Sequence, residues 1–163
     1  PARGMGRPDP VKFLLDTHAV LWIAESSPRL SPKVRALAGK GAADDFAVAA
    51  ISLLEIARKA RSGEIDLTPD PAAWLEDLGY RIRILPLTPR IAWRAVDLDW
   101  AHRDPADRLI CAAALEHKIP LVTHDLEITR WGGVPVICEQ FGRLPRAGCG
   151  EQSLCSVGGW LGG

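Results

Sequence analysis

The stretch VKFLLDTHAVLWIAE (11–25) joins a short apolar run to a helical pattern through a single aspartate. The run VKFLL (11–15) is almost continuously apolar, which is typical of a strand that is covered on both faces. The segment HAVLWIAE (18–25) follows with the apolar spacing of a helix. A buried strand that leads directly into a helix is the building unit of α/β folds.

The same alternation continues along the chain. Further strands are predicted at FAVAA (46–50), RIRIL (81–85), PLVT (120–123) and VPVI (134–137). Further helices are predicted at 31–40, 52–63, 71–80, 89–98 and 105–118. Strands that alternate with helices favour a three-layer α/β/α sandwich with a central, mostly parallel sheet.

The length of 163 residues is that of one domain, which we place at 11–138. The lead-in 1–10 is rich in proline and glycine, and the tail 139–163 is rich in glycine. Neither shows apolar periodicity, and we predict both to be disordered. No apolar run approaches the roughly 18 residues of a membrane span, so we expect no membrane role. With no signal peptide visible in the printed sequence, we expect the protein in the reducing cytoplasm.

The overall charge and the cysteines argue against two classes of protein, a strongly basic nucleic-acid binder and a zinc protein. Twenty basic residues balance twenty acidic ones, which removes the general sign of a nucleic-acid binder but leaves local basic patches open. The four cysteines form no CxxC pair, so zinc is not expected. Cys111 interrupts the apolar run LICAAAL (109–115) and is predicted to be a small core residue rather than a nucleophile.

Four acids fall at positions that one edge of a parallel sheet would share. Asp16 ends the first predicted strand and Asp125 follows the fourth, while Glu55 and Asp107 lie near the starts of helices. Open α/β sheets bind ligands at the carboxyl ends of their strands. A close pair of carboxylates repels by ~4 kcal/mol at an effective dielectric near 20, and a divalent cation offsets that cost. Oxygen ligands of this kind favour Mg²⁺ or Mn²⁺.

Structural explanations compete with this one. Asp16 followed by threonine can form a local turn that is solvated. The segment SLLE (52–55) matches a capping box, in which Ser52 and Glu55 satisfy each other's backbone donors. For Asp125, an outer position around the ion and a solvated position both stay open.

The segment HRDPADRLI (102–110) contains two acids in one turn of the chain. Asp104 fits the N-cap of a helix whose first residue is Pro105. Asp107 then lies at the third helical position and can point into a site. We therefore expect Asp104 mainly to begin the helix and Asp107 mainly to serve the ion.

Four segments resemble, in order and spacing, the acidic motifs of PIN domains, in particular those of VapC-type toxins. They are LLDTHAVLW (14–22), SLLEIARK (52–59), HRDPADRLICAAAL (102–115) and IPLVTHD (119–125). The resemblance covers roughly 11–138. It implies a metal-dependent endoribonuclease on an α/β/α fold, usually dimeric and held inactive by a cognate antitoxin. The chain departs from the family pattern at Ala106, where these toxins usually have an aromatic residue, and in its tail.

The resemblance also implies roles for individual residues. The acids that gather the ions match Asp16, Glu55, Asp107 and Asp125, and Thr123 supports the site. On this reading Asp16 and Asp107 bind Mg²⁺ or Mn²⁺, which activates a water to hydrolyse an RNA phosphodiester. Glu55 positions that water or acts as a base, and Asp125 orients the site.

The remaining polar and aromatic candidates receive secondary roles. RNA phosphates need nearby cations, and the candidates are Arg58, Lys59, Arg61, Arg103 and Arg108. Three histidines near the motifs are expected to form hydrogen bonds or face solvent rather than bind metal: His18, His102 and His124. Trp22 and Trp93 lie on apolar helical stripes and are expected in the core or at a partner contact. The first helix and the segment after it could form an apolar groove for the antitoxin.

Other function classes fit less well. A haloacid-dehalogenase phosphotransferase needs a second aspartate where this chain has His18. A Rossmann nucleotide-binding domain needs a glycine-rich turn after its first strand, which is absent. The alternative that remains is a PIN-like binding module that keeps the fold and the partner surface without catalysis.

Overall fold

The computed structural model describes residues 11–27, 30–40 and 45–138. Its five strands form one sheet in the order β3-β2-β1-β4-β5, and every pair is parallel. The strands are β1 (Phe13–Leu15), β2 (Phe46–Ala49), β3 (Arg83–Leu85), β4 (Leu121–Thr123) and β5 (Val136–Cys138). All five predicted strands and the parallel α/β class are confirmed. The predicted lead-in 1–10 and tail 139–163 lie outside the described residues.

Seven helices connect or follow these strands in the described part of the chain. They are α1 (Thr17–Ala24), α2 (Pro32–Lys40), α3 (Ala50–Ser62), α4 (Pro71–Arg81), α5 (Pro89–Asp97), α6 (Pro105–His117) and α7 (Leu126–Trp131). Six were predicted, and α7 was missed because its six residues are too few to display a helical period. None of these described helices combines the length and apolar character that crossing a bilayer requires.

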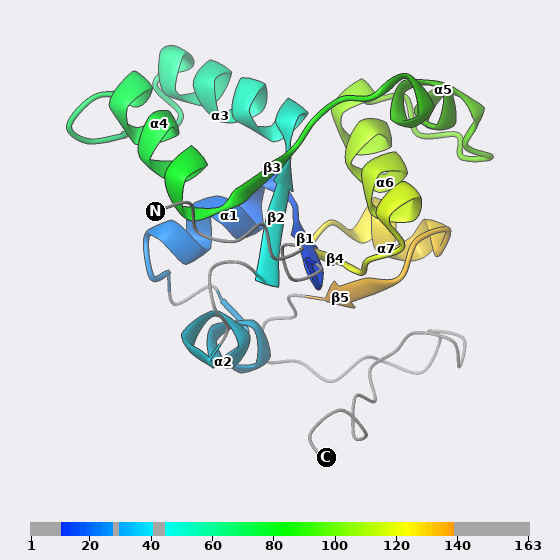
Figure 1. Ribbon diagram of the computed structural model, residues 1–163, viewed down its shortest axis with the longest axis horizontal. Helices are drawn as coiled ribbons and strands as arrows, with labels where there is room; N and C mark the ends of the chain where they lie inside the picture. Colours follow the sequence, from blue (N-terminus) through cyan, green and yellow to red (C-terminus); the bar gives the residue numbers. More distant parts are fainter. Residues whose placement is uncertain (1–10, 28–29, 41–44, 139–163) are drawn as a thin grey trace, which may run out of the picture.

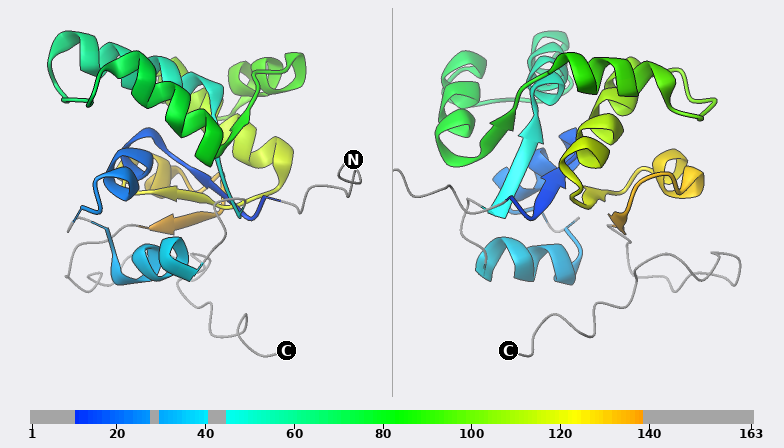
Figure 2. Two further views of the ribbon diagram at one scale, coloured as in Figure 1. Left: turned by 60° about the vertical axis from the view of Figure 1, so that its left-hand side comes forward. Right: turned by 45° about the vertical axis from the view of Figure 1, so that its right-hand side comes forward.

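The sheet separates two apolar cores. Successive strand residues point to opposite faces, so Leu14 and Leu15 of β1 belong to different cores. The core around Leu14 includes residues of α5, α6 and α7, and the core around Leu15 includes residues of α1, α2, α3 and α4. Figures 1 and 2 show α3 and α4 on one side of the sheet and α5 to α7 on the other. The predicted three-layer arrangement is therefore present.

The strand order reverses at the centre of the sheet. The chain adds β2 and β3 on one side of β1 and then returns to add β4 and β5 on the other. Right-handed crossovers in opposite directions send the helices to opposite faces, and open α/β sheets bind ligands at such a reversal, which here is at the carboxyl ends of β1 and β4. Asp16 follows β1 there, and its backbone N–H donates to the carbonyl of Val122 in β4 at 3.0 Å. This reversal determines where the motif acids meet.

Candidate active site

Asp16 is a buried acid at the carboxyl end of β1, with only 5% of the residue exposed. Its Oδ1 accepts a 2.6 Å hydrogen bond from the N–H of Ala19, which makes Asp16 the N-cap of α1. Its Oδ2 accepts a hydrogen bond from the hydroxyl of Thr123. Burial raises the pKa of Asp16, although both hydrogen bonds and the nearby His18 and His124 act to lower it. This burial argues against the solvated turn that the sequence left open.

Thr123 connects two of the motif acids through one hydroxyl group. Its Oγ1 donates to Asp16 and accepts the backbone N–H of Asp125 at 2.9 Å. Asp125 is the N-cap of α7, because its Oδ1 accepts the N–H groups of Glu127 and Ile128 at 2.6 and 3.1 Å. Helix α7, which the sequence did not predict, therefore orients Asp125. The other carboxylate oxygen of Asp125, Oδ2, has no partner among the described residues.

Glu55 reaches the start of α1 from the second turn of α3. Its Oε2 accepts a 2.6 Å hydrogen bond from the hydroxyl of Thr17, the residue after Asp16. The capping box is not formed, because α3 begins at Ala50 and Ser52 is already inside the helix. The hydroxyl of Ser52 is buried without a partner in the described structure. The contacts of Glu55 therefore point to the site rather than to its own helix.

Asp104 precedes α6 and caps it, as expected, whereas Asp107 lies inside the helix. Asp104 is the N-cap and accepts the N–H of Ala106 at 2.8 Å. Asp107 lies in the first turn, where its Oδ2 is 2.7 Å from Nε2 of His102. Burial raises the pKa of Asp107, the hydrogen bond from His102 lowers it, and the charges of Asp104 and Asp125 raise it. Asp107 is thus a partly desolvated carboxylate among other acids.

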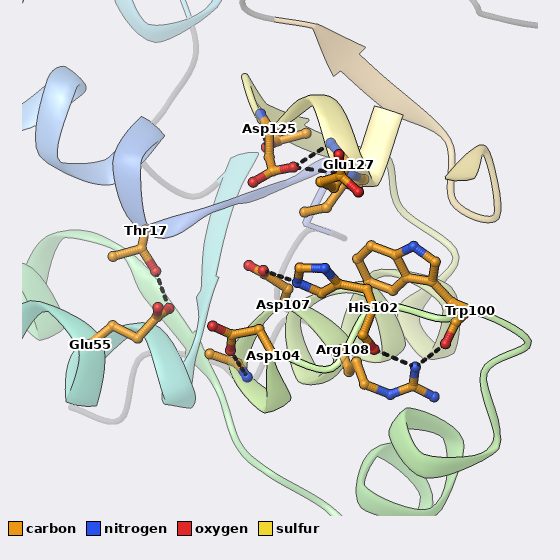
Figure 3. A network of polar contacts seen from close by, with 12 residues as sticks. Thr17, Glu55, Trp100, His102, Asp104, Asp107, Arg108, Asp125 and Glu127 are labelled. Atoms are coloured by element: carbon orange, nitrogen blue, oxygen red, sulfur yellow. Dashed lines mark hydrogen bonds and ion pairs between the residues drawn. The ribbon is translucent and has the colours of Figure 1, made fainter. Parts of the chain in front are cut away.

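Three of these acids affect the pKa of the buried thiol of Cys111. Desolvation raises the pKa of Cys111 to about 12, and the charges of Asp107, Asp125 and Asp16 contribute to the rise. The thiol is therefore protonated near neutral pH and belongs to the core, as predicted. Figure 3 shows four carboxylates around one region: Glu55 of α3, Asp107 of α6, and Asp104 and Asp125, which cap α6 and α7.

A cluster of three potential ligands is present that the sequence analysis did not identify. The ligand atoms of Asp16, His18 and His124 all lie within 4.8 Å of one another. Among the described residues, the four predicted acids form no such group of three by themselves. The one available signal was that both histidines stand next to motif residues, which is too weak to assign a ligand.

Arg108 is engaged in the loop between α5 and α6. Its guanidinium donates at 2.6 to 3.1 Å to five backbone carbonyls, which belong to Ala95, Val96, Leu98, Trp100 and His102. A phosphate would have to displace these acceptors. This geometry argues against the expected contact of Arg108 with RNA and assigns the side chain to the loop that precedes α6.

The other cations expected to bind RNA differ in whether their side chains are already paired with an acid. Lys59 pairs with Glu64 at 3.1 Å on the surface of α3, and Arg58 is exposed on the same helix. Arg103 is exposed beside Asp104 and makes no hydrogen bond or ion pair with any residue that the structure describes. Arg103 is therefore the best placed of these cations to meet a phosphate near Asp107.

The two tryptophans have different environments. Trp22 is buried, with its ring centroid 4.5 Å from that of His124. Trp93 is 71% exposed on α5, so its predicted place in the core is wrong. Its apolar stripe faces solvent instead, which leaves the partner contact as the expectation for Trp93.

We predict that Asp104 acts through its capping hydrogen bond rather than its charge. Replacing it by alanine is expected to lower the free energy of unfolding by about 1 kcal/mol, whereas asparagine, which also caps, should cost a few tenths. Urea denaturation of both variants measures the difference. An equal loss in the two variants would contradict the capping role.

We also predict a pH dependence of stability from Asp16. Its raised folded pKa means that the native state prefers the protonated form. The stabilising contribution is complete below the ordinary value of 3.8 and is lost as the pH rises through the folded pKa. In chelator-containing buffer, the melting temperature of Asp16→Asn minus that of the wild type should therefore increase with pH. A difference that stays constant across this window would contradict the prediction.

Comparisons with known proteins agree with this architecture. A family model described as PIN domain matches residues 13–133. Ribonuclease VapC22 of Mycobacterium tuberculosis is 42% identical over 113 residues, which are 69% of this chain and 85% of that protein.

Two solved structures share the fold at low sequence identity. DNA-bound VapBC from Salmonella typhimurium matches with a TM-score of 0.62 and 20% identity, covering 80% of this chain and 99% of that one. A toxin-antitoxin complex from Klebsiella pneumoniae matches with a TM-score of 0.59 and 19% identity, covering 79% and 98%. With the family match spanning most of the chain, we conclude that this protein belongs to the PIN domain family and is a VapC-type member of it.

Proposed function

We propose that this protein is a metal-dependent endoribonuclease and the toxin of a toxin–antitoxin pair. The observation that favours this function most is the buried Asp16 at the strand reversal, whose carboxylate is joined through the hydroxyl of Thr123 to the backbone of Asp125. The 42% identity to a protein named as a ribonuclease supports the same activity.

The acids fit an Mg²⁺ or Mn²⁺ ion by their chemistry. Asp16 and Asp107 are partly or fully desolvated carboxylates whose raised pKa values reflect an unfavourable negative charge. A divalent cation would offset that charge, and both ions prefer carboxylate oxygens. When bound, the ion would lower the pKa of a water and stabilise the charge that develops on the phosphate.

The protein's own groups would position the reacting atoms. Thr123 fixes the carboxylate of Asp16, and His102 fixes that of Asp107 through the 2.7 Å contact. Glu55 uses Oε2 for Thr17, and its Oε1 makes no hydrogen bond within the described residues. Oε1 is therefore suited to accept a proton from an attacking water.

The proposed partners are an RNA substrate, a cognate antitoxin and a second copy of the chain. The Klebsiella pneumoniae structure is a toxin-antitoxin complex, which supports an antitoxin partner for this chain. Arg103 and Arg58 are the cations proposed to contact RNA phosphates on either side of the acids. The homodimer rests on the resemblance to VapC-type toxins alone.

Metal binding tests the proposal whichever RNA is the target. We would titrate Mn²⁺ into the purified chain by calorimetry, beside Asp16→Asn and Asp107→Asn variants whose folding is checked by circular dichroism. The matched control is Asp77→Asn, which removes an exposed acid paired with Arg81 on α4.

The expected result is binding by the wild type and the control and loss of binding in both site variants. No binding by a folded wild type would contradict the nuclease mechanism and favour the non-catalytic PIN-like binding module instead. Binding that both variants retain would show that the ion lies elsewhere.

A further inference from the structure

Two imidazole rings lie beside the buried carboxylate of Asp16. His18 is in the first turn of α1, and His124 follows β4 at the adjacent carboxyl end. Their ring centroids are 4.9 Å apart in an edge-to-face arrangement. With Asp16 they offer three ligand atoms within 4.8 Å of one another. The pairing of β1 with β4 thus creates a cluster of two nitrogens and one oxygen.

Aromatic packing accounts for the rings but not for their nitrogen atoms. The ring of His124 lies 4.5 Å from that of Trp22, which explains why it is partly buried. Nδ1 of His124 is nevertheless buried without a hydrogen-bond partner among the described residues. Buried polar atoms are rarely left unpaired, because the lost hydration is not replaced. An unpaired nitrogen in one member of a ligand cluster indicates that the cluster has a function of its own.

We propose that Asp16, His18 and His124 form a binding site for a borderline divalent ion, of which Zn²⁺ is the representative. Two imidazoles and one carboxylate are a common protein set for zinc, and they leave the fourth position to water. Mg²⁺ does not favour this set, because it prefers oxygen ligands. This proposal departs from the sequence-based expectation, which gave no role to zinc and no metal-ligand role to either histidine.

The geometry requires only a small local adjustment. Two ligand atoms on one tetrahedral zinc lie about 3.4 Å apart, from metal–ligand distances near 2.1 Å. The three atoms here lie within 4.8 Å of one another, and His18 is exposed, so its side chain is free to rotate toward Asp16.

The site has a consequence that rests on the proposed function. Asp16 would belong to both ion sites, and its two carboxylate oxygens already accept hydrogen bonds from Ala19 and Thr123. One carboxylate in this position cannot serve two ions independently. Zn²⁺ is therefore expected to weaken Mn²⁺ binding, and removal of Zn²⁺ should restore it.

Nuclear magnetic resonance of the imidazole nitrogens tests the site directly. Zn²⁺ alone is added to the full chain, and the side-chain nitrogen resonances of its four histidines are followed. The resonances of His18 and His124 are expected to shift, whereas that of the exposed His117 at the end of α6 should not. Zinc bound by cysteines elsewhere in the chain would leave the imidazoles unchanged and would overturn the proposal.

Calorimetry with folded variants supplies the second measurement. His18→Gln and His124→Gln are each expected to weaken Zn²⁺ binding by at least about tenfold, since loss of even an outer contact costs that much, while His117→Gln keeps wild-type affinity. Both site variants should still bind Mn²⁺. Undiminished Zn²⁺ affinity, or joint loss of Zn²⁺ and Mn²⁺, would contradict a distinct imidazole site.

The two proposals fail in different ways. Asp107→Asn should abolish Mn²⁺ binding and leave Zn²⁺ binding in place. If Mn²⁺ binding does not depend on Asp107, the proposed nuclease centre is wrong while the imidazole site can still stand. If Zn²⁺ binding does not depend on His18 and His124, the imidazole site is wrong while the proposed nuclease centre can still stand.

Discussion

Replacing Asp107 by asparagine is expected to reduce RNA cleavage by at least about 100-fold without unfolding the protein. Asparagine has nearly the same shape and keeps an oxygen that can accept a hydrogen bond from His102. It lacks the negative charge that a divalent ion requires. Total RNA is incubated with antitoxin-free protein and Mn²⁺, and sequencing of the cleaved 5′ ends then measures this loss at whichever RNA is cut.

The control for this experiment is again Asp77→Asn, which changes an exposed acid on α4 that is not one of the motif acids. It should cleave at the same positions and at the wild-type rate. Cleavage by Asp107→Asn at a rate within a few-fold of the wild type would exclude Asp107 from the reaction.

Replacing Arg108 by methionine is expected to lower the free energy of unfolding by about 3 kcal/mol, the largest stability effect we predict. One guanidinium donates to five carbonyls at the end of α5 and in the loop before α6. Hydrogen bonds from charged groups contribute about 1.5 to 3 kcal/mol each, although such contributions do not add fully. The corresponding fall in melting temperature is about 10 °C.

Arg103→Met is the matched control, because Arg103 is exposed and makes no hydrogen bond or ion pair within the described residues. Its melting temperature should stay close to that of the wild type. Arg108→Lys should recover only part of the loss, since an ammonium group has three donors and cannot span the same set of acceptors. A melting temperature for Arg108→Met within about 2 °C of the wild type would show that water replaces the guanidinium at little cost.

Local patterns were sufficient for most of the fold. Most of the predicted strands are short apolar runs, which are typical of a sheet that is covered on both faces. The N-cap at Asp104 was also correct, because its hydrogen bond to Ala106 involves only neighbouring residues. Such features depend on the residues in one turn or one strand, which the sequence displays directly.

Local patterns misled where a tertiary contact competes with them. The segment that begins at Ser52 looks like a capped helix start, yet β2 runs directly into α3 and the helix begins at Ala50. The packing of buried residues in β2 and α3 stabilises this helix start, which has no side-chain cap. Trp93 likewise was assigned to an apolar helical stripe, but the core covers the face of α5 that holds Ile91 and Ala95, and Trp93 lies on the solvent face.

The sequence by itself determined the α/β class, the parallel strands and the acids that follow them, because periodicity and helix capping act over a few residues. The tertiary structure alone decided the five carbonyls that surround Arg108 and the meeting of His18 with His124. These contacts depend on β4 returning to pair with β1 and on α6 packing against α5. The physical reason is that strand order and helix packing are set by burial of the whole chain, and no short segment contains that information.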